Sequence, residues 1–264
     1  MPAVQLARLR AQVEELSSRF SQPAVYLRAL RDLLELYADR TYQPGQGVPS
    51  QVLTPSYHVP MLVMRQLESS LESHARENPI VALPLADLLW QEEYLEPRLL
   101  AASALGQAPL MPPEQILDRL VAWAQTGDER LVRAGLFSHG TDRLRREFPD
   151  LWLQRIQVWF SDPNPTAQMM ALEALLPLVR DPNYQDLPPI FPLVQPLLRA
   201  APAPLQAPLQ DLLEALARRS SVETTYILRQ ILTMQRPPAL TRLVRRCLPA
   251  FDPADQAVLK TLLK

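Results

Sequence analysis

The chain of 264 residues contains very little cysteine and very little glycine. Its single cysteine, Cys247, excludes an intrachain disulfide and a metal cluster made of cysteines. A chain without disulfides is typical of a reducing compartment, so we expect a cytoplasmic protein. Only 6 glycines accompany 28 prolines, and this balance disfavours glycine-turned β-structure. It favours many short helices that begin and end at proline.

The chain also lacks a long apolar run and an excess of one charge. No segment approaches the roughly 20 apolar residues that cross a bilayer, and the charged N-terminal segment has no signal-peptide core, so we expect no membrane partner. Basic residues number 27 against 28 acidic ones, which gives no overall field that attracts nucleic acid. Residues 66–129 hold 11 acidic and 3 basic side chains, whereas residues 211–264 hold 5 acidic and 9 basic ones. We therefore expect weak DNA affinity from the acidic N-terminal half.

Apolar residues recur at helical spacing along most of the chain. No segment alternates apolar and polar residues without a better helical interpretation, so we predict about fourteen helices and essentially no sheet. Their approximate ranges are 3–20, 23–40, 59–77, 80–90, 94–105, 112–125, 128–138, 141–160 with a break near residue 149, 166–180, 187–200, 203–219, 222–234, 238–248 and 253–263.

Residues 41–56 interrupt the helical pattern. They contain three prolines and two glycines and have no helical period, which predicts a loop. We therefore predict an N-terminal helical hairpin at residues 1–40, this Pro/Gly-rich loop, and a helical repeat array at residues 57–264. We expect the array and the hairpin to form one continuous domain.

One stretch, residues 83–106, predicts a helix, a polar turn and a second helix. Within it, Arg98, Ala101 and Ala104 have the spacing of the arginine and the small packing residues of a HEAT-like repeat. A similar spacing follows Asp162, and equivalent helices recur about every 30–40 residues. Hairpins that each leave one apolar face uncovered stack on their neighbours. The predicted fold is therefore an all-α superhelix, a HEAT-like repeat solenoid that is curved and has a concave binding face.

Residues 57–106 carry a further set of features at fixed spacing. They are His58-Val59, Arg65, Leu89-Trp90, Tyr94, Glu96, Arg98 and Leu100-Ala101. In this pattern the chain resembles the HEAT-like DNA alkylation repair proteins, the alkylpurine DNA glycosylases. A thinner, collinear similarity continues through residues 151–180 and 209–232.

The resemblance implies a catalytic aspartate on the concave face, with tryptophan and arginine neighbours. Such a carboxylate would stabilise the positive charge that develops as a cationic alkylated base leaves, and tryptophan would offer a π-face to it. Trp123 and Asp128 lie about where the family has its tryptophan and aspartate. The family's next arginine falls at Met169 or Met170, and Glu214 stands near its second tryptophan. Asp128 has the alternative role of a helix N-cap, and Trp123 that of a core residue.

The C-terminal region supplies the best candidate for nucleic-acid binding. Its basic cluster comprises Arg218, Arg219, Arg242, Arg245 and Arg246. Phosphate binding needs such a cluster on one face, and the alternative is an ordinary solvated helix surface. No aromatic residue lies among the C-terminal arginines, which disfavours single-strand binding.

No motif predicts a metal or a cofactor, because the three histidines are scattered and no glycine-rich phosphate loop or nucleophile elbow is present. The favoured function is a non-catalytic HEAT-like binding protein that holds a protein or duplex DNA on its concave face. The first alternative is a divergent alkylpurine DNA glycosylase that uses Asp128 and Trp123. The second is a DNA-binding protein without base excision that uses the C-terminal arginines.

Overall fold

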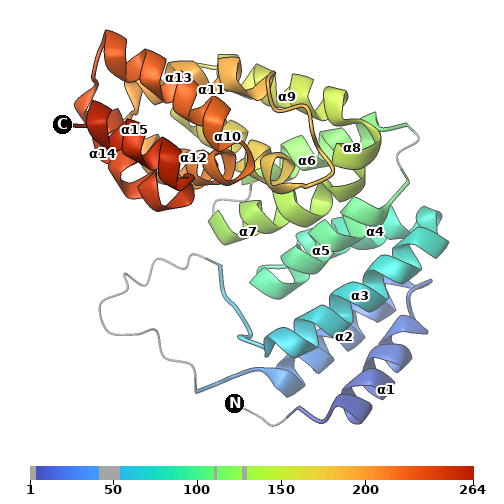
Figure 1. Ribbon diagram of the computed structural model, residues 1–264. Coiled ribbons are helices and arrows are strands. Elements are labelled where there is room, and N and C mark those ends of the chain that lie inside the picture. Colours follow the sequence, from blue (N-terminus) through green and yellow to red (C-terminus); the bar gives the residue numbers. More distant parts are fainter. Residues whose placement is uncertain (1–3, 42–53, 110–111, 127–129) are drawn as a thin grey trace. The chain divides into compact units, whose positions relative to one another are not determined.

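The computed structural model describes residues 4–41, 54–109, 112–126 and 130–264 (Figure 1). All regular secondary structure in these residues is helical, and no strand occurs among them. The predicted all-α class is confirmed. No helix in this described part of the chain is long and apolar enough to cross a membrane.

The chain divides into two compact units, Met1–Glu147 and Phe148–Lys264. The first unit contains α1 (Leu6–Ser17), α2 (Pro23–Tyr37), α3 (Met61–Glu77), α4 (Pro79–Trp90), α5 (Leu95–Gln107), α6 (Glu114–Thr126), α7 (Arg130–Gly135), the π-helical turn η1 (Leu136–Gly140) and α8 (Asp142–Glu147). The second contains α9 (Pro149–Ser161), α10 (Pro165–Arg180), α11 (Ile190–Ala200), the 3₁₀ turn η2 (Ala203–Leu205), α12 (Gln206–Arg219), α13 (Ser221–Met234), α14 (Pro238–Cys247), the 3₁₀ turn η3 (Leu248–Ala250) and α15 (Pro253–Leu262).

Proline begins many of these helices, as the composition predicts. It is the first residue of α2, α4, α9, α10, α14 and α15. Proline fits this position because the backbone N–H groups of the first helical turn have no carbonyl partner within the helix. Proline has no backbone N–H group, so nothing is lost there. At α10 the side chain of Asn164 also accepts a hydrogen bond from the Thr166 backbone N–H at 3.0 Å, which caps the helix.

One predicted helix, at residues 128–138, ends differently in the structure. Its first residues lie outside the described ranges, and α7 passes after Gly135 into the π-helical turn η1. This turn packs directly on α5 at Gly106. A Cβ atom placed on Gly106 would lie 1.8 Å from the carbonyl oxygen of His139. The close approach of the two backbones therefore depends on glycine at this position.

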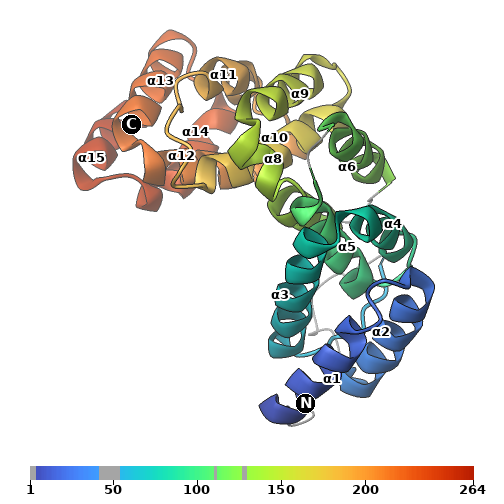
Figure 2. The same cartoon turned by 90° about the vertical axis from the view of Figure 1, so that its right-hand side faces the viewer.

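The first five helices form two rows, in which each helix contacts the next helix of its row. One row is α1, α3 and α5, and the other is α2 and α4 (Figures 1 and 2). The fully buried Leu9, Leu67 and Leu100 belong to the first row. The guanidinium of Arg31 on α2 binds both carboxylate oxygens of Glu92, at 2.8 and 2.5 Å, and so ties the first hairpin to the turn before α5.

The second unit is built in the same way. Helices α10, α12 and α14 form one row, and α11, α13 and α15 form another. Helix α9 packs on α10 and carries Trp152 and Trp159, whose rings meet edge to face at 5.8 Å. Both indoles are buried, so the interpretation of these two tryptophans as core residues that share a face is confirmed.

Most of the predicted loop at residues 41–56 lies outside the described ranges, because residues 42–53 are not described. The segment becomes visible again at Thr54, which is buried. From there the chain runs to α3, and the carbonyl oxygen of Pro55 accepts a hydrogen bond from the Leu95 backbone N–H at 2.8 Å. The entry to α3 is therefore fastened to the start of α5.

Candidate functional site

The candidate catalytic Trp123 stacks on a second tryptophan. Its ring on α6 lies parallel to that of Trp90 on α4, with centroids 4.6 Å apart and an interplanar angle of 4°. The two residues are only 7% and 9% exposed. One π-face of Trp123 is covered by Trp90, and little of its surface remains open to solvent. A base could stack on Trp123 only after this packing had changed.

Two further contacts fix the stacked pair in place. Arg119 on α6 binds Asp87 on α4 through two hydrogen bonds of 2.9 Å, which is the two-pronged geometry that arginine and carboxylate favour. The guanidinium of Arg98 lies 5.9 Å from the centre of the Trp90 ring, within cation–π range. The same group donates to the carbonyl oxygen of Glu92 at 2.7 Å. Helices α4, α5 and α6 thus hold the tryptophans together.

The neighbouring motif residues Tyr94 and Glu96 anchor the segment that enters α3. Glu96 is 4% exposed and accepts hydrogen bonds from the Ser56 hydroxyl at 2.8 Å and the Tyr57 backbone N–H at 3.1 Å. The rings of Tyr57 and Tyr94 stack with centroids 4.2 Å apart. A buried carboxylate needs such donors, because leaving it without them carries a large desolvation cost. Both residues therefore have structural partners.

The second catalytic candidate, Asp128, lies outside the described residues, as do its two neighbours in sequence. Its geometry relative to Trp123 stays a prediction, and so does its alternative role as a helix N-cap. The described chain stops at Thr126, the last residue of α6, and resumes at Arg130, the first residue of α7.

The five candidate nucleic-acid-binding arginines lie on two helices of the second unit, α12 and α14. Arg218 pairs with Glu214 at 3.1 Å. Arg219 donates to the carbonyl oxygens of Val179, Asp181 and Tyr184, and so closes the end of α10. These contacts use both guanidinium groups within the fold.

The remaining three arginines of this set lie on α14 and are exposed. Arg245 donates to the carbonyl oxygen of Leu263 at 2.8 Å. Arg242 and Arg246 make no hydrogen bond or ion pair with any residue that the structure describes. Of the predicted cluster, Arg242 and Arg246 thus have guanidinium groups that are available to a ligand without the loss of such a contact.

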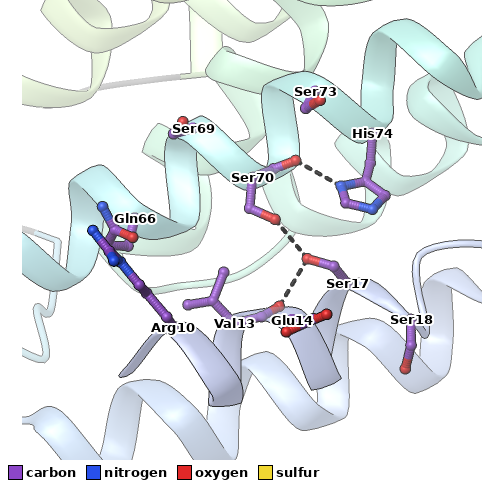
Figure 3. A pocket seen from close by; sticks show the side chains of 10 residues that line it. All are labelled: Arg10, Val13, Glu14, Ser17, Ser18, Gln66, Ser69, Ser70, Ser73 and His74. Carbon is purple, nitrogen blue, oxygen red and sulfur yellow. Dashed lines mark hydrogen bonds between the residues drawn. The ribbon is translucent and has the colours of Figure 1, made fainter. Parts of the chain in front are cut away.

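A polar cavity of about 620 Å³ lies between α1 and α3 (Figure 3). Five serines line it, and the two helices are joined there by a 2.6 Å hydrogen bond between the Ser17 and Ser70 hydroxyls. Because Ser17 donates its proton to the Val13 carbonyl oxygen at 2.8 Å, Ser70 must be the donor to Ser17. His74 Nδ1 lies 2.8 Å from the Ser70 carbonyl oxygen. That nitrogen therefore carries a proton, since a carbonyl only accepts.

Sequence reasoning did not single out this cavity, although a signal for it exists. Ser69, Ser70 and Ser73 stand one and three residues apart, which places them around one side of a helix. Gln66 extends the same polar face by one turn toward the N-terminus, and His74 lies beside Ser73 at its other end. A helix face of small hydroxyl groups leaves room beside its neighbour, and α1 contributes Ser17 and Ser18 to that space.

Two carboxylates on another part of α3 have altered acidity. Burial raises the pKa of Glu68 and of Glu72 above the ordinary glutamate value, and the positive charge that His139 can carry opposes this rise. Repulsion from Glu72 also raises the pKa of Glu68, and repulsion from Asp142 raises the pKa of Glu72. A raised pKa in a partly buried carboxylate is a feature of general acids, and it is also a common result of helix packing.

The comparison with known protein families adds one match. The family model described as DNA alkylation repair enzyme matches residues 55–221. This range covers more than half of the chain. The chain belongs to the DNA alkylation repair enzyme family. The comparisons with curated proteins and with solved structures give no match.

The match shows which parts of this DNA alkylation repair family member are shared with the family. It begins at Pro55, directly before the Ser56–Glu96 contact, and it includes the Trp90–Trp123 stack and the undescribed Asp128. Helices α1 and α2, and the C-terminal helices from α13 onward, lie almost wholly outside it. In the described residues, no group of three His, Cys, Asp or Glu side chains could hold a metal ion.

Proposed function

We propose that this member of the DNA alkylation repair family is a HEAT-like repeat protein that binds a partner and does not excise bases. The observation that carries the proposal is the Trp90–Trp123 stack, in which both indoles are more than nine-tenths buried. A glycosylase needs an accessible aromatic face beside its carboxylate to stabilise the departing cationic base. Here the tryptophan at the expected place is packed into the scaffold.

The packing of the helices supports the repeat architecture in this proposal. Within each unit, helices contact their second neighbours along two rows, which is the contact pattern of stacked helical hairpins. A curved solenoid of this kind offers a concave surface for a protein or nucleic acid. The overall net charge of −1 favours a protein over duplex DNA, because DNA binding gains most of its affinity from cationic groups.

Base excision is tested directly on methylated duplex DNA. The full chain is incubated with duplex that has been treated with a methylating agent, and released methylated bases are measured by chromatography. We expect no release above the rate without protein. Release that Asp128→Asn abolishes would refute the proposal and establish the alternative, a divergent glycosylase that uses Asp128. Arg130→Gln, a charge change at the first residue of α7, serves as the matched control.

DNA binding without excision is tested separately through its salt dependence. Affinity for a duplex oligonucleotide is measured by fluorescence anisotropy at several salt concentrations. A protein that neutralises several phosphates loses affinity steeply as salt rises, with a logarithmic slope of about −0.9 per phosphate. We expect weak binding and a slope near zero. A steep slope that Arg242→Gln with Arg246→Gln reduces would instead support the DNA-binding alternative.

A further inference from the structure

Helices α11 and α13 of the second unit border a cavity outside the features described above. Its volume is about 570 Å³, and the two helices lie side by side (Figure 1). The lining residues are Arg199 of α11 and Tyr226, Arg229, Gln230, Thr233 and Met234 of α13. Those of α13 follow one another at intervals of three and one residues, so they form one face of the helix.

The charges that line this cavity are all positive. Arg199 and Arg229 are exposed, and no carboxylate is among the lining residues. Neither guanidinium makes a hydrogen bond or an ion pair with any residue that the structure describes. Arg218 on the preceding helix differs, because Glu214 neutralises it at 3.1 Å. The α11/α13 cavity therefore has an unsatisfied capacity for anionic groups.

The same face of α13 also exposes large apolar side chains. Met234 is 78% exposed, Tyr226 is 60% exposed, and Val222 one turn earlier is 68% exposed. Most amphipathic helices turn such residues toward the core, as α13 does with Leu228 and Leu232. A row of exposed apolar residues beside unpaired arginines is typical of a surface that a partner covers.

We propose that the α11/α13 face binds an acidic peptide segment of a partner protein, with an apolar anchor residue between its carboxylates. This inference rests on the proposed function and names the class of partner. The carboxylates would pair with Arg199 and Arg229, and the anchor would cover Tyr226 and Met234. Helix α13 has 14 residues and is thus about 21 Å long, which an extended peptide of about six residues would span.

A single strand of nucleic acid fits the same face less well. Its phosphates would satisfy the two arginines, and one base could stack on Tyr226. Met234 and Val222 would remain in water, because a nucleic acid brings no aliphatic side chain to cover them. The net charge of −1 also gives no general attraction for a polyanion. The apolar residues therefore favour a peptide.

The binding test uses the full chain and a fluorescein-labelled pool of peptides of about twelve residues, long enough to span α13. In these peptides Asp or Glu alternates with Leu around a central Phe. A second pool replaces the carboxylates by their amides, and a third replaces Leu and Phe by Ser. We expect only the first pool to raise the anisotropy at low micromolar protein, since both the charge and the anchor contribute.

Variants locate the site on the chain. Arg199→Gln with Arg229→Gln should weaken binding by roughly tenfold, because each of the two exposed charge pairs contributes about threefold to the affinity. Tyr226→Ser should weaken binding by about tenfold or more, as exposed aromatic anchors do. The matched control is Arg242→Gln with Arg246→Gln, which removes the same charge from exposed arginines of α14. All these side chains are exposed, and circular dichroism verifies that each variant folds.

Three results would overturn the inference. The first is that the wild type does not bind the acidic apolar pool. The second is that the cavity double variant and the control double variant lose peptide affinity equally. The third is that an oligothymidine probe binds more tightly than the peptides and that its binding depends on Arg199 and Arg229. A methyl signal of Met234, assigned through Met234→Leu, should shift when the peptide binds. The base-release assay is independent of these readouts. Released bases would refute the proposed function, whereas the peptide-binding measurements alone decide whether the α11/α13 face binds an acidic peptide.

Discussion

The indole rings of Trp90 and Trp123 lie parallel, 4.6 Å apart, at the contact between α4 and α6. Arg119 and Asp87 bridge the same two helices through a pair of 2.9 Å hydrogen bonds. An apolar stack and a two-pronged ion pair thus support each other across one helix–helix contact. This combination makes the orientation of Trp123 a property of the scaffold, and it ties any change at Trp123 to the stability of the first unit.

Replacement of Trp123 should therefore be costly for folding. We expect Trp123→Ala to lower the free energy of unfolding by about 3–5 kcal/mol, since it removes a buried indole and leaves a cavity. Trp123→Phe keeps an aromatic ring on Trp90 and should cost about 1–2 kcal/mol. Urea unfolding followed by tryptophan fluorescence measures both. A Trp123→Ala protein as stable as the wild type would contradict the packing described here.

Glu96 should be equally sensitive to a change that preserves its shape. Glu96→Gln keeps the size of the side chain but replaces one acceptor oxygen by a donor, opposite the Ser56 hydroxyl and the Tyr57 N–H. We expect a loss of about 1–3 kcal/mol, because hydrogen bonds to a charged carboxylate are replaced by weaker ones to a neutral amide. Ser56→Ala removes one donor to Glu96 and the acceptor of the His58 backbone N–H, and it should cost less because that N–H is exposed to water. A double-mutant cycle between residues 56 and 96 checks that the two effects are coupled.

Much of the fold was predictable from the sequence because its rules are local. Prolines at positions 23, 79, 149, 165, 238 and 253 stand at helix starts, and the break near Pro149 separates α8 from α9. The π-helical turn at residues 136–140 was not predictable in this way. It accompanies the contact of Gly106 with the His139 backbone, which joins residues far apart in the chain. The burial of the tryptophans was predictable because each of them lies on the apolar face of a predicted helix.

The candidate site was predictable only in part, for a physical reason. A run of arginines predicts positive charge, but it does not show whether carbonyl groups or carboxylates already bind each guanidinium. Arg219 binds three carbonyl oxygens, whereas Arg199 and Arg229 have no such partners among the described residues. The α11/α13 cavity joins side chains from two helices. Its composition therefore depends on how those helices pack, which no single stretch of sequence contains.

The contact at Gly106 gives a sharp test of the α5–η1 packing. Gly106→Ala would place a methyl group 1.8 Å from the His139 carbonyl oxygen, so the two backbones must separate. We expect a loss of about 1–3 kcal/mol from this overpacking. Gly140→Ala is the matched control, because its nearest neighbours are flexible leucine side chains at 3.2 Å. Thermal unfolding should show a much larger fall in Tm for Gly106→Ala than for Gly140→Ala.

The raised pKa of Glu72 predicts a pH-dependent effect on stability. Burial is the main cause, so the folded state binds the proton more tightly than the unfolded state does. Its contribution to stability is then fully present below the ordinary glutamate pKa and is lost as the pH rises through the folded pKa. Glu72→Gln removes the charge and should stabilise the protein at pH 7, by less than about 1 kcal/mol because the group is half exposed.

The pH profile separates this effect from a simple loss of contacts. The advantage of Glu72→Gln should shrink as the pH falls from 7 toward the ordinary glutamate pKa, where the wild-type side chain becomes protonated in both states. The charges of His139, Arg76 and Arg146 lower the pKa of Glu72 and should moderate the change, whereas the charge of Asp142 raises this pKa and should add to it. Glu77→Gln, at an exposed position of the same helix, is the control. A constant difference between wild type and Glu72→Gln at all pH values would contradict the assignment.

Cys247 offers a chemical probe of the second unit. Burial, with smaller contributions from Glu214 and Asp211, raises the pKa of its thiol to about 12, and the side chain has no solvent exposure. At pH 8 only about one thiol in ten thousand is then ionised, and the thiolate is the reactive form. We expect an aromatic disulfide reagent to react very slowly with the folded protein and at once in denaturant.

The rate at which the reagent modifies Cys247 in the folded protein should follow the opening of the α12–α14 contact. Gly106→Ala, which acts in the first unit, should leave this rate unchanged if the two units open independently.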